Sequence, residues 1–183
     1  YPTIDPSTCT DCGMCAKTCP VAPANTGKHR HTEPPSIHAA WNLDPQIRAT
    51  SSSGGVFSVL ANRILDEGGI VVGAGYDADL SVRHVIVSDR QGVERLRGSK
   101  YLQSRIGFDV FNGVKSALKN GQKVLFTGTP CQIAGIRSFI RKDSPLLITA
   151  DIVCHGVPSP GLWQKYLAFK QANGSKIVAN SFR

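Results

Sequence analysis

From residue 51 onward, short apolar runs alternate with stretches whose apolar residues recur every three or four positions. The runs at residues 70–75, 82–88, 124–126 and 146–153 are typical of buried strands. The longer spacing predicts helices over residues 56–65, 106–118, 133–140 and 162–167. This alternation predicts an α/β fold with a mixed or mostly parallel sheet flanked by helices.

Weaker patterns give further expectations. Residues 37–41 and 176–182 read as two additional strands, the second at the end of the chain. The helix that follows the serine-glycine loop should bury Val56, Leu60 and Ile64, together with their apolar neighbours. We expect His84 to lie on the exposed side of its strand, and Trp163 to belong to the core rather than to a stacking surface.

Cys131 and Cys154 each follow an apolar run, and a single predicted helix separates the two runs. Consecutive strands joined by one helix normally lie parallel and close together, so both cysteines should meet at the carboxyl edge of the sheet. Ligands of open α/β sheets bind at that edge. We therefore expect this pair to mark the centre of the functional site. The alternative is that both are small buried hydrophobic side chains.

The composition is that of a folded protein without a membrane segment. The 183 residues are 41% hydrophobic and 19% charged, which is enough for one domain with a small appendage. No long apolar run or secretory signal is present, so a cytoplasmic protein without a membrane span is expected. The net charge of +8 comes from basic residues spread along the chain with few interleaved aromatic residues. An acidic electron-transfer partner and an anionic cofactor account for this charge, and we expect no nucleic acid partner.

A tight cysteine run stands near the start of the chain. Cys9, Cys12, Cys15 and Cys19 have the spacing C-x2-C-x2-C-x3-C and are followed by proline, which is typical of bacterial 4Fe-4S ferredoxins. Three of these thiolates should hold one cluster, and Cys19 should turn to a second. A zinc knuckle is the alternative, although zinc ligands are usually separated by a longer loop. Residues 1–35 are thus predicted to be a small ferredoxin-like iron-sulfur segment and linker, and residues 36–183 an α/β domain.

Two loops carry side chains suited to an anionic or aromatic ligand. The residues 51–55 (SSSGG) precede a predicted helix and offer hydroxyls, backbone N–H groups and a positive helix end to a phosphate. Serine also caps ordinary helices, so the pattern alone leaves phosphate binding open. In the segment 98–104, Lys100 could meet a phosphate and Tyr101 could cover a flat ring. A capped turn before the next helix is the alternative.

With these motifs identified, the chain resembles the coenzyme F-420 hydrogenase/dehydrogenase beta-subunit family, in particular its ferredoxin-fused bacterial members. The likeness covers essentially the whole chain. It is carried by the cysteine run and by residues 51–57 (SSSGGVF), 98–101 (GSKY), 128–133 (GTPCQI) and 154–160 (CHGVPSP).

The resemblance implies an iron-sulfur flavoprotein. It implies that FAD lies on the serine-glycine, GSKY and GTP loops, with contacts from Ser52, Ser53, Gly54, Gly55, Lys100, Tyr101, Gly128, Thr129 and Pro130. By position, Cys131 and Cys154 match two ligands of an inner 4Fe-4S cluster, whose other two ligands form a later cysteine pair in the family. This sequence has no such pair and no initiator methionine, and it stops just after the apparent strand 176–182. We therefore expect it to be part of a longer protein, with the α/β domain truncated at its C-terminus.

The functional expectation is an oxidoreductase that relays electrons between 4Fe-4S clusters and FAD and reduces or oxidises a small-molecule or deazaflavin-type substrate. Its partner would be a redox protein such as ferredoxin, or a hydrogenase or dehydrogenase subunit. One alternative is a non-catalytic electron-transfer or scaffold module that docks an acidic redox partner. Another is thiol chemistry, with Cys131 as nucleophile at a helix N-terminus and His155 as base.

Overall fold

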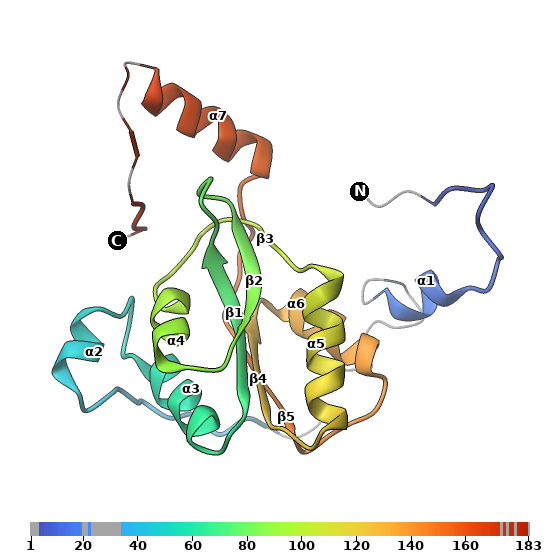
Figure 1. Ribbon diagram of the computed structural model, residues 1–183, viewed down its shortest axis with the longest axis horizontal. Helices are drawn as coiled ribbons and strands as arrows, with labels where there is room; N and C mark the ends of the chain where they lie inside the picture. The colour runs from blue at the N-terminus through green and yellow to red at the C-terminus, as the bar shows by residue number, and fades with distance from the viewer. Residues whose placement is uncertain are drawn as a thin grey trace.

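A five-stranded sheet forms the centre of the protein, with the strand order β3-β2-β1-β4-β5 (Figure 1). The computed structural model describes residues 4–19, 22, 34–172, 174, 176–177 and 179–182. β1 pairs with β4 and β4 with β5 in parallel, β2 pairs with β3 in parallel, and β1 and β2 form an antiparallel pair. The predicted mixed, mostly parallel sheet is thus confirmed. The strands are β1 (Ile70–Tyr76), β2 (Val82–Val87), β3 (Ser104–Arg105), β4 (Val124–Gly128) and β5 (Leu147–Asp151).

Helices cover both faces of this sheet. Figure 1 shows α3 and α4 on one side and α5 and α6 on the other. The four predicted helices are confirmed as α3, α5, α6 and α7, whereas α1, α2 and α4 were not anticipated. No helix among the described residues is long and apolar enough to cross a bilayer. The helices are α1 (Met14–Thr18), α2 (Pro45–Ala49), α3 (Val56–Asp66), α4 (Arg90–Leu96), α5 (Phe108–Lys119), α6 (Pro130–Ile140) and α7 (Pro160–Gln171).

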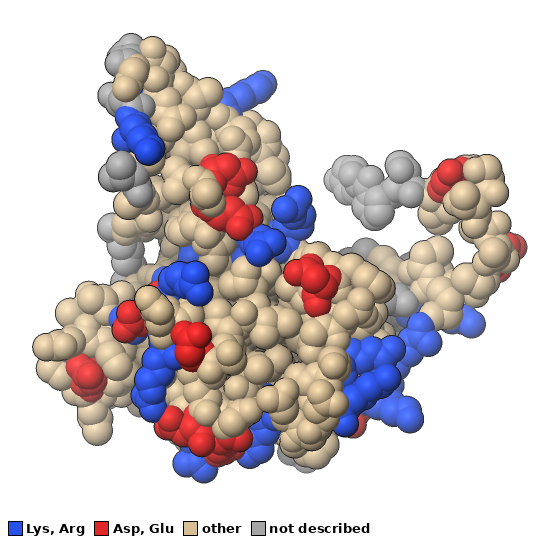
Figure 2. All heavy atoms as spheres, in the orientation of Figure 1, with Lys and Arg blue, Asp and Glu red and all other residues tan. Residues whose placement is uncertain are grey.

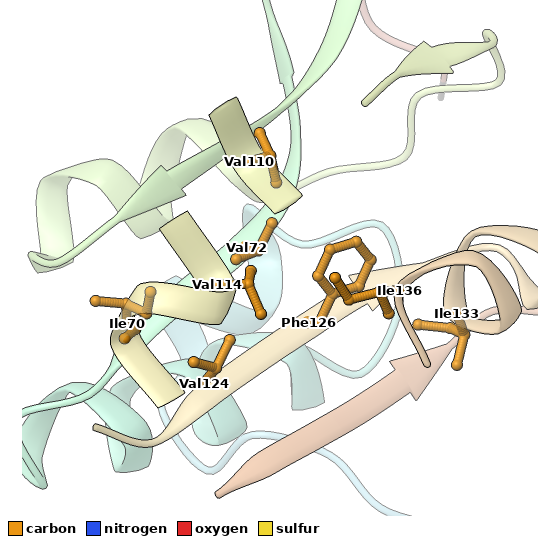
Figure 3. Packing of buried hydrophobic residues seen from close by; sticks show 9 residues of the cluster. Ile70, Val72, Val110, Val114, Val124, Phe126, Ile133 and Ile136 are labelled. Carbon is orange, nitrogen blue, oxygen red and sulfur yellow. The ribbon is translucent and has the colours of Figure 1, made fainter. Parts of the chain in front are cut away.

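The core has two halves, one on each face of β4. Val124 and Phe126 pack with α5 and α6, where Ile136 is fully buried (Figure 3). Leu125 points the other way and packs against Ala61 of α3. Residues alternate in this way because successive side chains of a strand point to opposite faces. Since both faces of β4 are covered along its buried residues 124–126, that part of its sequence is a continuous apolar run.

The buried face of α3 differs in part from the predicted one. Ala61 and Ile64 are buried, but Val56 and Leu60 are 36% and 39% exposed. Phe57 packs against the same cluster as Ala61 and Ile64. These three residues have the i, i+4, i+7 spacing of a single helix face, and the sheet lies under that face. The expectation for Val56 and Leu60 was therefore wrong.

Two predicted strands are absent from the described residues. In the segment 37–41, Ile37 and Trp41 are 91% and 60% exposed, and no residue is in a strand. This segment runs along the serine-glycine loop instead, because the Asn42 N–H donates to the Gly54 carbonyl at 2.6 Å. At the other end of the chain, residues 176–177 and 179–182 also form no strand.

α7 is attached to the sheet at few points and stands beyond the turn between β1 and β2 (Figure 1). Leu167 is its buried residue, with 5% exposure. Trp163 is only half-buried, so its assignment to the core was wrong. Its indole N–H donates to the Leu80 carbonyl at 2.9 Å, and its ring stacks on Tyr166. A tryptophan with a polar N–H often lies at such a boundary, where a partner for that group is within reach.

Candidate functional site

Cys131 and Cys154 lie beyond the same edge of the sheet. β4 and β5 run parallel, and their last paired residues are Gly128 and Asp151. The Ile152 N–H extends this pairing by donating to the Gly128 carbonyl at 3.1 Å. Each cysteine stands three residues after one member of the Gly128–Asp151 pair. Both are exposed free thiols, so the reading of two buried hydrophobic side chains was wrong. That they face one common cavity stays a prediction.

The loop that carries Cys131 is fixed by a capping box at the start of α6. Thr129 is the N-cap residue, and its N–H donates to Gln132 Oε1 at 2.9 Å. Pro130 follows in the first turn, where its missing N–H costs no helical hydrogen bond. The Thr129 hydroxyl lies 3.1 Å from the Cys131 sulfur. Among the described residues no hydrogen bond joins Cys131 to His155, so the thiol-nucleophile alternative gains no support from the geometry.

His84 is buried, and the prediction of an exposed residue was wrong. It is 2% exposed, and its ring stacks on Phe126 at 5.5 Å. Nε2 lies 2.9 Å from the Thr127 carbonyl, and Nδ1 lies 2.7 Å from the Ser104 hydroxyl. Because a carbonyl can only accept, Nε2 carries the proton and Nδ1 accepts from Ser104. Burial is the main cause that lowers the His84 pKa below its ordinary value of 6.5. The two-residue period from buried Val82 was the signal that would have placed His84 inside.

A cavity of about 450 Å³ forms where the serine-glycine loop meets the loop after α4. This volume falls within the range of small-molecule sites, roughly 300–1,000 Å³. The Ser52 hydroxyl accepts the Ser99 N–H at 2.6 Å and so joins the two loops. The lining consists of Ala49, Thr50, Ser51, Ser52, Tyr76, Arg95, Arg97, Gly98, Ser99, Lys100, Asn180, Ser181 and Phe182.

The cavity gathers part of the predicted flavin contacts. Ser52 and Lys100 belong to its lining. Tyr101 lies just outside it, 55% exposed, and makes an edge contact with the Phe182 ring. The other predicted contacts, which also lie outside the lining, are Ser53, Gly54, Gly55, Gly128, Thr129 and Pro130.

The basic side chains of Arg95, Arg97 and Lys100 make this cavity electropositive. Lys100 uses all three ammonium protons on the carbonyls of Leu96, Arg97 and Gly98, at 3.0, 3.2 and 3.2 Å. It therefore caps the end of α4, and burial lowers its pKa to about 8. Arg97 donates from Nη1 to Thr50 Oγ1 at 2.7 Å. Its Nε is buried without a hydrogen-bond partner among the described residues. An oxygen atom of an anionic ligand would satisfy this donor.

Sequence reasoning missed Arg95 and Arg97. Both immediately precede the Gly98–Lys100 loop in the stretch RLRGSKY, and that local cluster was the available signal. The short helix α4, which ends next to these residues, had its own signal in Asp89, a typical N-cap residue. In the structure Asp89 accepts the Gly92 N–H at 2.6 Å.

The two glycines of the serine-glycine loop are required by the fold. Gly55 has a φ of +76°, and a Cβ there would lie 3.1 Å from Asn42 Cβ and 3.2 Å from Ser51 Oγ. A Cβ at Gly54 would lie 2.8 Å from the Ala40 carbonyl oxygen. A larger residue at either position would strain the loop whether or not a ligand binds. Direct contact of these glycines with a cofactor stays a prediction.

The N-terminal cysteine run contains the turns and donors that suit iron-sulfur ligation. The Asp11 N–H donates to the Cys9 sulfur at 3.4 Å. A hydrogen bond from the Met14 N–H, and a smaller contribution from the Thr10 hydroxyl, lower the Cys12 pKa. Both donors favour the thiolate, which is the form that binds iron. Among the described residues, however, no three His, Cys, Asp or Glu side chains are gathered closely enough to hold a metal ion. The donor chemistry fits a cluster, although the thiols do not surround a common point.

Cys154 shows the same kind of turn, since the Gly156 N–H donates to its sulfur at 3.4 Å. Hydrogen bonds to cluster sulfurs are one of the means by which proteins tune reduction potentials. Cys131 and Cys154 are thus both exposed and both lie beyond the same edge of the sheet. The sulfurs of Cys9 and Cys154 each accept a hydrogen bond from the backbone N–H two residues further along the chain.

The fold and these sites together define an α/β protein with an electropositive cavity and an N-terminal iron-sulfur segment. Comparison with protein families supports this description. A 4Fe-4S binding domain model matches residues 1–24. The models for the coenzyme F420 hydrogenase/dehydrogenase beta subunit match residues 37–107 with the N-terminal part and residues 121–183 with the C-terminal part. The chain belongs to the coenzyme F420 hydrogenase/dehydrogenase beta-subunit family, which confirms the resemblance stated above.

A solved structure shares the fold. It is described as a xenon derivative of the F420-reducing [NiFe] hydrogenase complex from Methanosarcina barkeri, and one of its chains is 24% identical with a TM-score of 0.55. The alignment covers 74% of this chain and 49% of that chain, so the present chain spans about half the length of this relative. A comparison with curated protein sequences finds no match.

The cysteine run gives the first prediction. Cys12→Ser should lower the iron content of anaerobically reconstituted protein by up to one cluster, about four iron atoms per chain, because a ligand is lost. Ser7→Ala, which changes an exposed hydroxyl in the same segment, should leave the iron content unchanged. Iron and sulfide assays provide the measurement, and equal iron in Cys12→Ser and wild type would contradict cluster ligation by this run.

His84 gives the second prediction. Its pKa is lower in the folded state, so below about pH 6.5 the unfolded chain binds a proton that the folded chain does not. The free energy of unfolding should therefore fall as the pH decreases from about 6.5. His84→Gln keeps an N–H donor for Thr127 without a titrating ring and should flatten this pH dependence. His84→Leu leaves buried groups unpaired and should cost about 1–3 kcal/mol at neutral pH. Urea unfolding at several pH values tests both variants, and an unchanged pH dependence in His84→Gln would contradict this account.

Proposed function

We propose that this chain is part of an iron-sulfur flavoprotein oxidoreductase that passes electrons between 4Fe-4S clusters and FAD. The observation that carries the proposal is the electropositive cavity beside two hydroxyl-bearing loops, in which a buried arginine donor has no hydrogen-bond partner within the described part of the chain. The family models add that the chain combines a 4Fe-4S binding segment with both parts of the beta-subunit domain. FAD supplies the chemistry that links single-electron and hydride transfer.

The residues of the cavity fit the pyrophosphate of FAD. Arg95 and Arg97 provide positive charge, and the hydroxyls of Ser52 and Ser99 provide short-range donors. Lys100 contributes charge rather than a direct hydrogen bond, since its ammonium protons are already used on carbonyls. Arginine is well suited to this task because its planar guanidinium matches the geometry of phosphate oxygens.

The remaining flavin contacts are proposed from the family resemblance. Tyr101 lies beside the cavity, where its ring is available to a flat ligand. The other residues of this group reach the ligand only if it extends beyond the cavity toward the sheet edge. They are Ser53, Gly54, Gly55, Gly128, Thr129 and Pro130.

Cys131 and Cys154 are proposed as two ligands of an inner 4Fe-4S cluster. Both are exposed thiols beyond the ends of adjacent parallel strands. Two thiolates are half of the usual set of four, so the proposal requires two further ligands from elsewhere in the assembled protein.

The substrate and the redox partner are proposed with support from the solved relative's description. The solved relative is part of an F420-reducing complex. We propose a deazaflavin-type or other small-molecule substrate, and either a hydrogenase or dehydrogenase subunit or a ferredoxin-like protein as redox partner.

The third prediction tests the FAD site. Arg95→Glu places a negative charge at the cavity and should weaken FAD binding about tenfold, which corresponds to about 1.4 kcal/mol. Arg90→Glu changes a residue of the same helix that forms an ion pair with Asp66 and does not line the cavity, so it serves as the matched control. Isothermal titration calorimetry measures the affinity for FAD, with FMN and ADP as comparison ligands.

The outcomes distinguish a flavoprotein oxidoreductase from a non-catalytic electron-transfer module. Weaker FAD binding in Arg95→Glu alone supports the proposed site. If wild type binds ADP as tightly as FAD, the cavity recognises a nucleotide without the flavin. If it binds none of these ligands but retains iron, the non-catalytic electron-transfer module becomes the better description.

The fourth prediction concerns the pH dependence of FAD binding. The pKa of Lys100 is about 8 in the free protein. A bound pyrophosphate would raise it, because a nearby negative charge favours the ammonium. Binding should therefore take up a proton, and FAD affinity should fall severalfold between about pH 7 and about pH 9.5. Lys100→Gln should lose most of this dependence, and an identical pH profile in the variant would contradict the placement of FAD phosphates near Lys100.

A further inference from the structure

Basic side chains gather where α5 and the end of α6 meet α1. We define the basic surface as Lys115 and Lys119 of α5 with Arg141 and Lys142 after α6, all four of them exposed. Lys115 and Lys119 are one turn apart, and the Lys115 ammonium lies 5.6 Å from the centre of the Phe139 ring on α6. Phe139 is two residues from Arg141. The packing of α5 on α6 therefore brings both pairs of cations onto neighbouring parts of one surface.

Within the part of the chain that the structure describes, the basic surface takes part in no ion pair, unlike several cations elsewhere. The ion pairs among the described residues involve Arg63, Arg83, Arg90, Arg97 and Lys123, and none includes a member of the basic surface. Asp143 and Asp109 are the acidic residues nearest to it along the chain. In Figure 2, Lys and Arg side chains form a group below α1, whereas acidic and basic side chains are interleaved on the opposite lower edge. An uncompensated group of cations attracts an anionic partner.

This surface adjoins the cysteine run. Arg141 Nη2 lies 3.9 Å from the sulfur of Met14, which stands between Cys12 and Cys15. Helix α1 and α6 are in contact. A protein that delivers electrons to this run, or takes them from it, must dock close by, and Arg141 of the basic surface lies at that position.

An exposed aromatic ring completes the surface. Phe108, at the start of α5, is 71% exposed and makes an edge contact with Phe139 at 6.1 Å. Small redox complexes combine a limited contact area with charge complementarity. A single exposed ring, linked to Lys115 through their shared contact with Phe139, matches such an interface better than a large apolar face would.

We propose that the basic surface is the docking site for an acidic electron-carrier protein of the ferredoxin type. This proposal rests on the proposed function, because it assumes that the cysteine run exchanges electrons. It adds the location of the partner and the sign of its charge.

The experiment measures binding of the anaerobically reconstituted chain to a purified acidic plant-type ferredoxin. Affinity should fall steeply as salt rises from about 50 to about 300 mM, because exposed charges are screened. Arg141→Glu combined with Lys142→Glu should weaken binding at least about tenfold, mainly through slower association. Arg63→Glu combined with Arg90→Glu produces the same change of net charge on α3 and α4 and should change the affinity less than about twofold.

A second double variant tests the proposal even if the first does not fold. Lys115→Glu combined with Lys119→Glu leaves the α6 terminus intact and should weaken binding to a similar degree. Thermal unfolding and iron content are recorded for every variant. Wild-type affinity in both folded double variants would overturn the proposal, as would tighter binding to an oligonucleotide or to anionic lipid vesicles than to ferredoxin.

The two proposals fail separately. A chain that retains iron and FAD but does not bind ferredoxin refutes the docking site alone. A chain that binds ferredoxin through the basic surface but takes up no FAD refutes the flavin site alone.

Discussion

The parallel pairing of β4 with both β1 and β5 is the constraint on which the rest of the structure depends. Val124, Leu125 and Phe126 are completely buried, and helices cover them on both faces. A strand buried in this way must have all its backbone groups paired, which fixes its register against both neighbours. That register places the ends of β4 and β5, Gly128 and Asp151, side by side. It therefore determines where the two cysteine-bearing loops leave the sheet.

Burying the polar side chains of His84, Arg97 and Lys100 costs free energy. Hydrogen bonds within the protein, or a bound ligand, offset this cost. Burial disfavours a charge on His84 and lowers its pKa, and its ring joins β2 to Ser104 and to Thr127. In the cavity, Arg97 Nε has no hydrogen-bond partner among the residues that the structure describes, and Lys100 has a lowered pKa. Unsatisfied or disfavoured charges in a concave region are more typical of a binding site than of a purely structural one.

Helix α6 connects the two groups of cysteines. Cys131 lies in its first turn, while Arg141, directly after its end, contacts Met14 within the cysteine run. A helix of eleven residues spans about 16 Å, because each residue adds about 1.5 Å. The rigid element that positions Cys131 is therefore also the one on which the iron-sulfur segment rests. Arg141 and Lys142 of the basic surface lie at the end of α6 opposite to Cys131.

The sequence by itself determined the strand-helix-strand order, the mixed sheet, the cysteine run and the placement of Cys131 and Cys154 at one edge. These features depend on local periodicity and on short-range spacing, which a single sequence records directly. Tertiary structure decided the rest. Arg95 and Arg97 became cavity residues only because the end of α4 packs beside the serine-glycine loop, and residues 37–41 stayed outside the sheet because Asn42 pairs with Gly54. The strand period pointed to the burial of His84, but its partners lie 20 and 43 residues away, so only the folded structure identified the groups that satisfy both ring nitrogens. Contacts between residues distant in the chain leave no periodic signal, and so only the folded structure decided them.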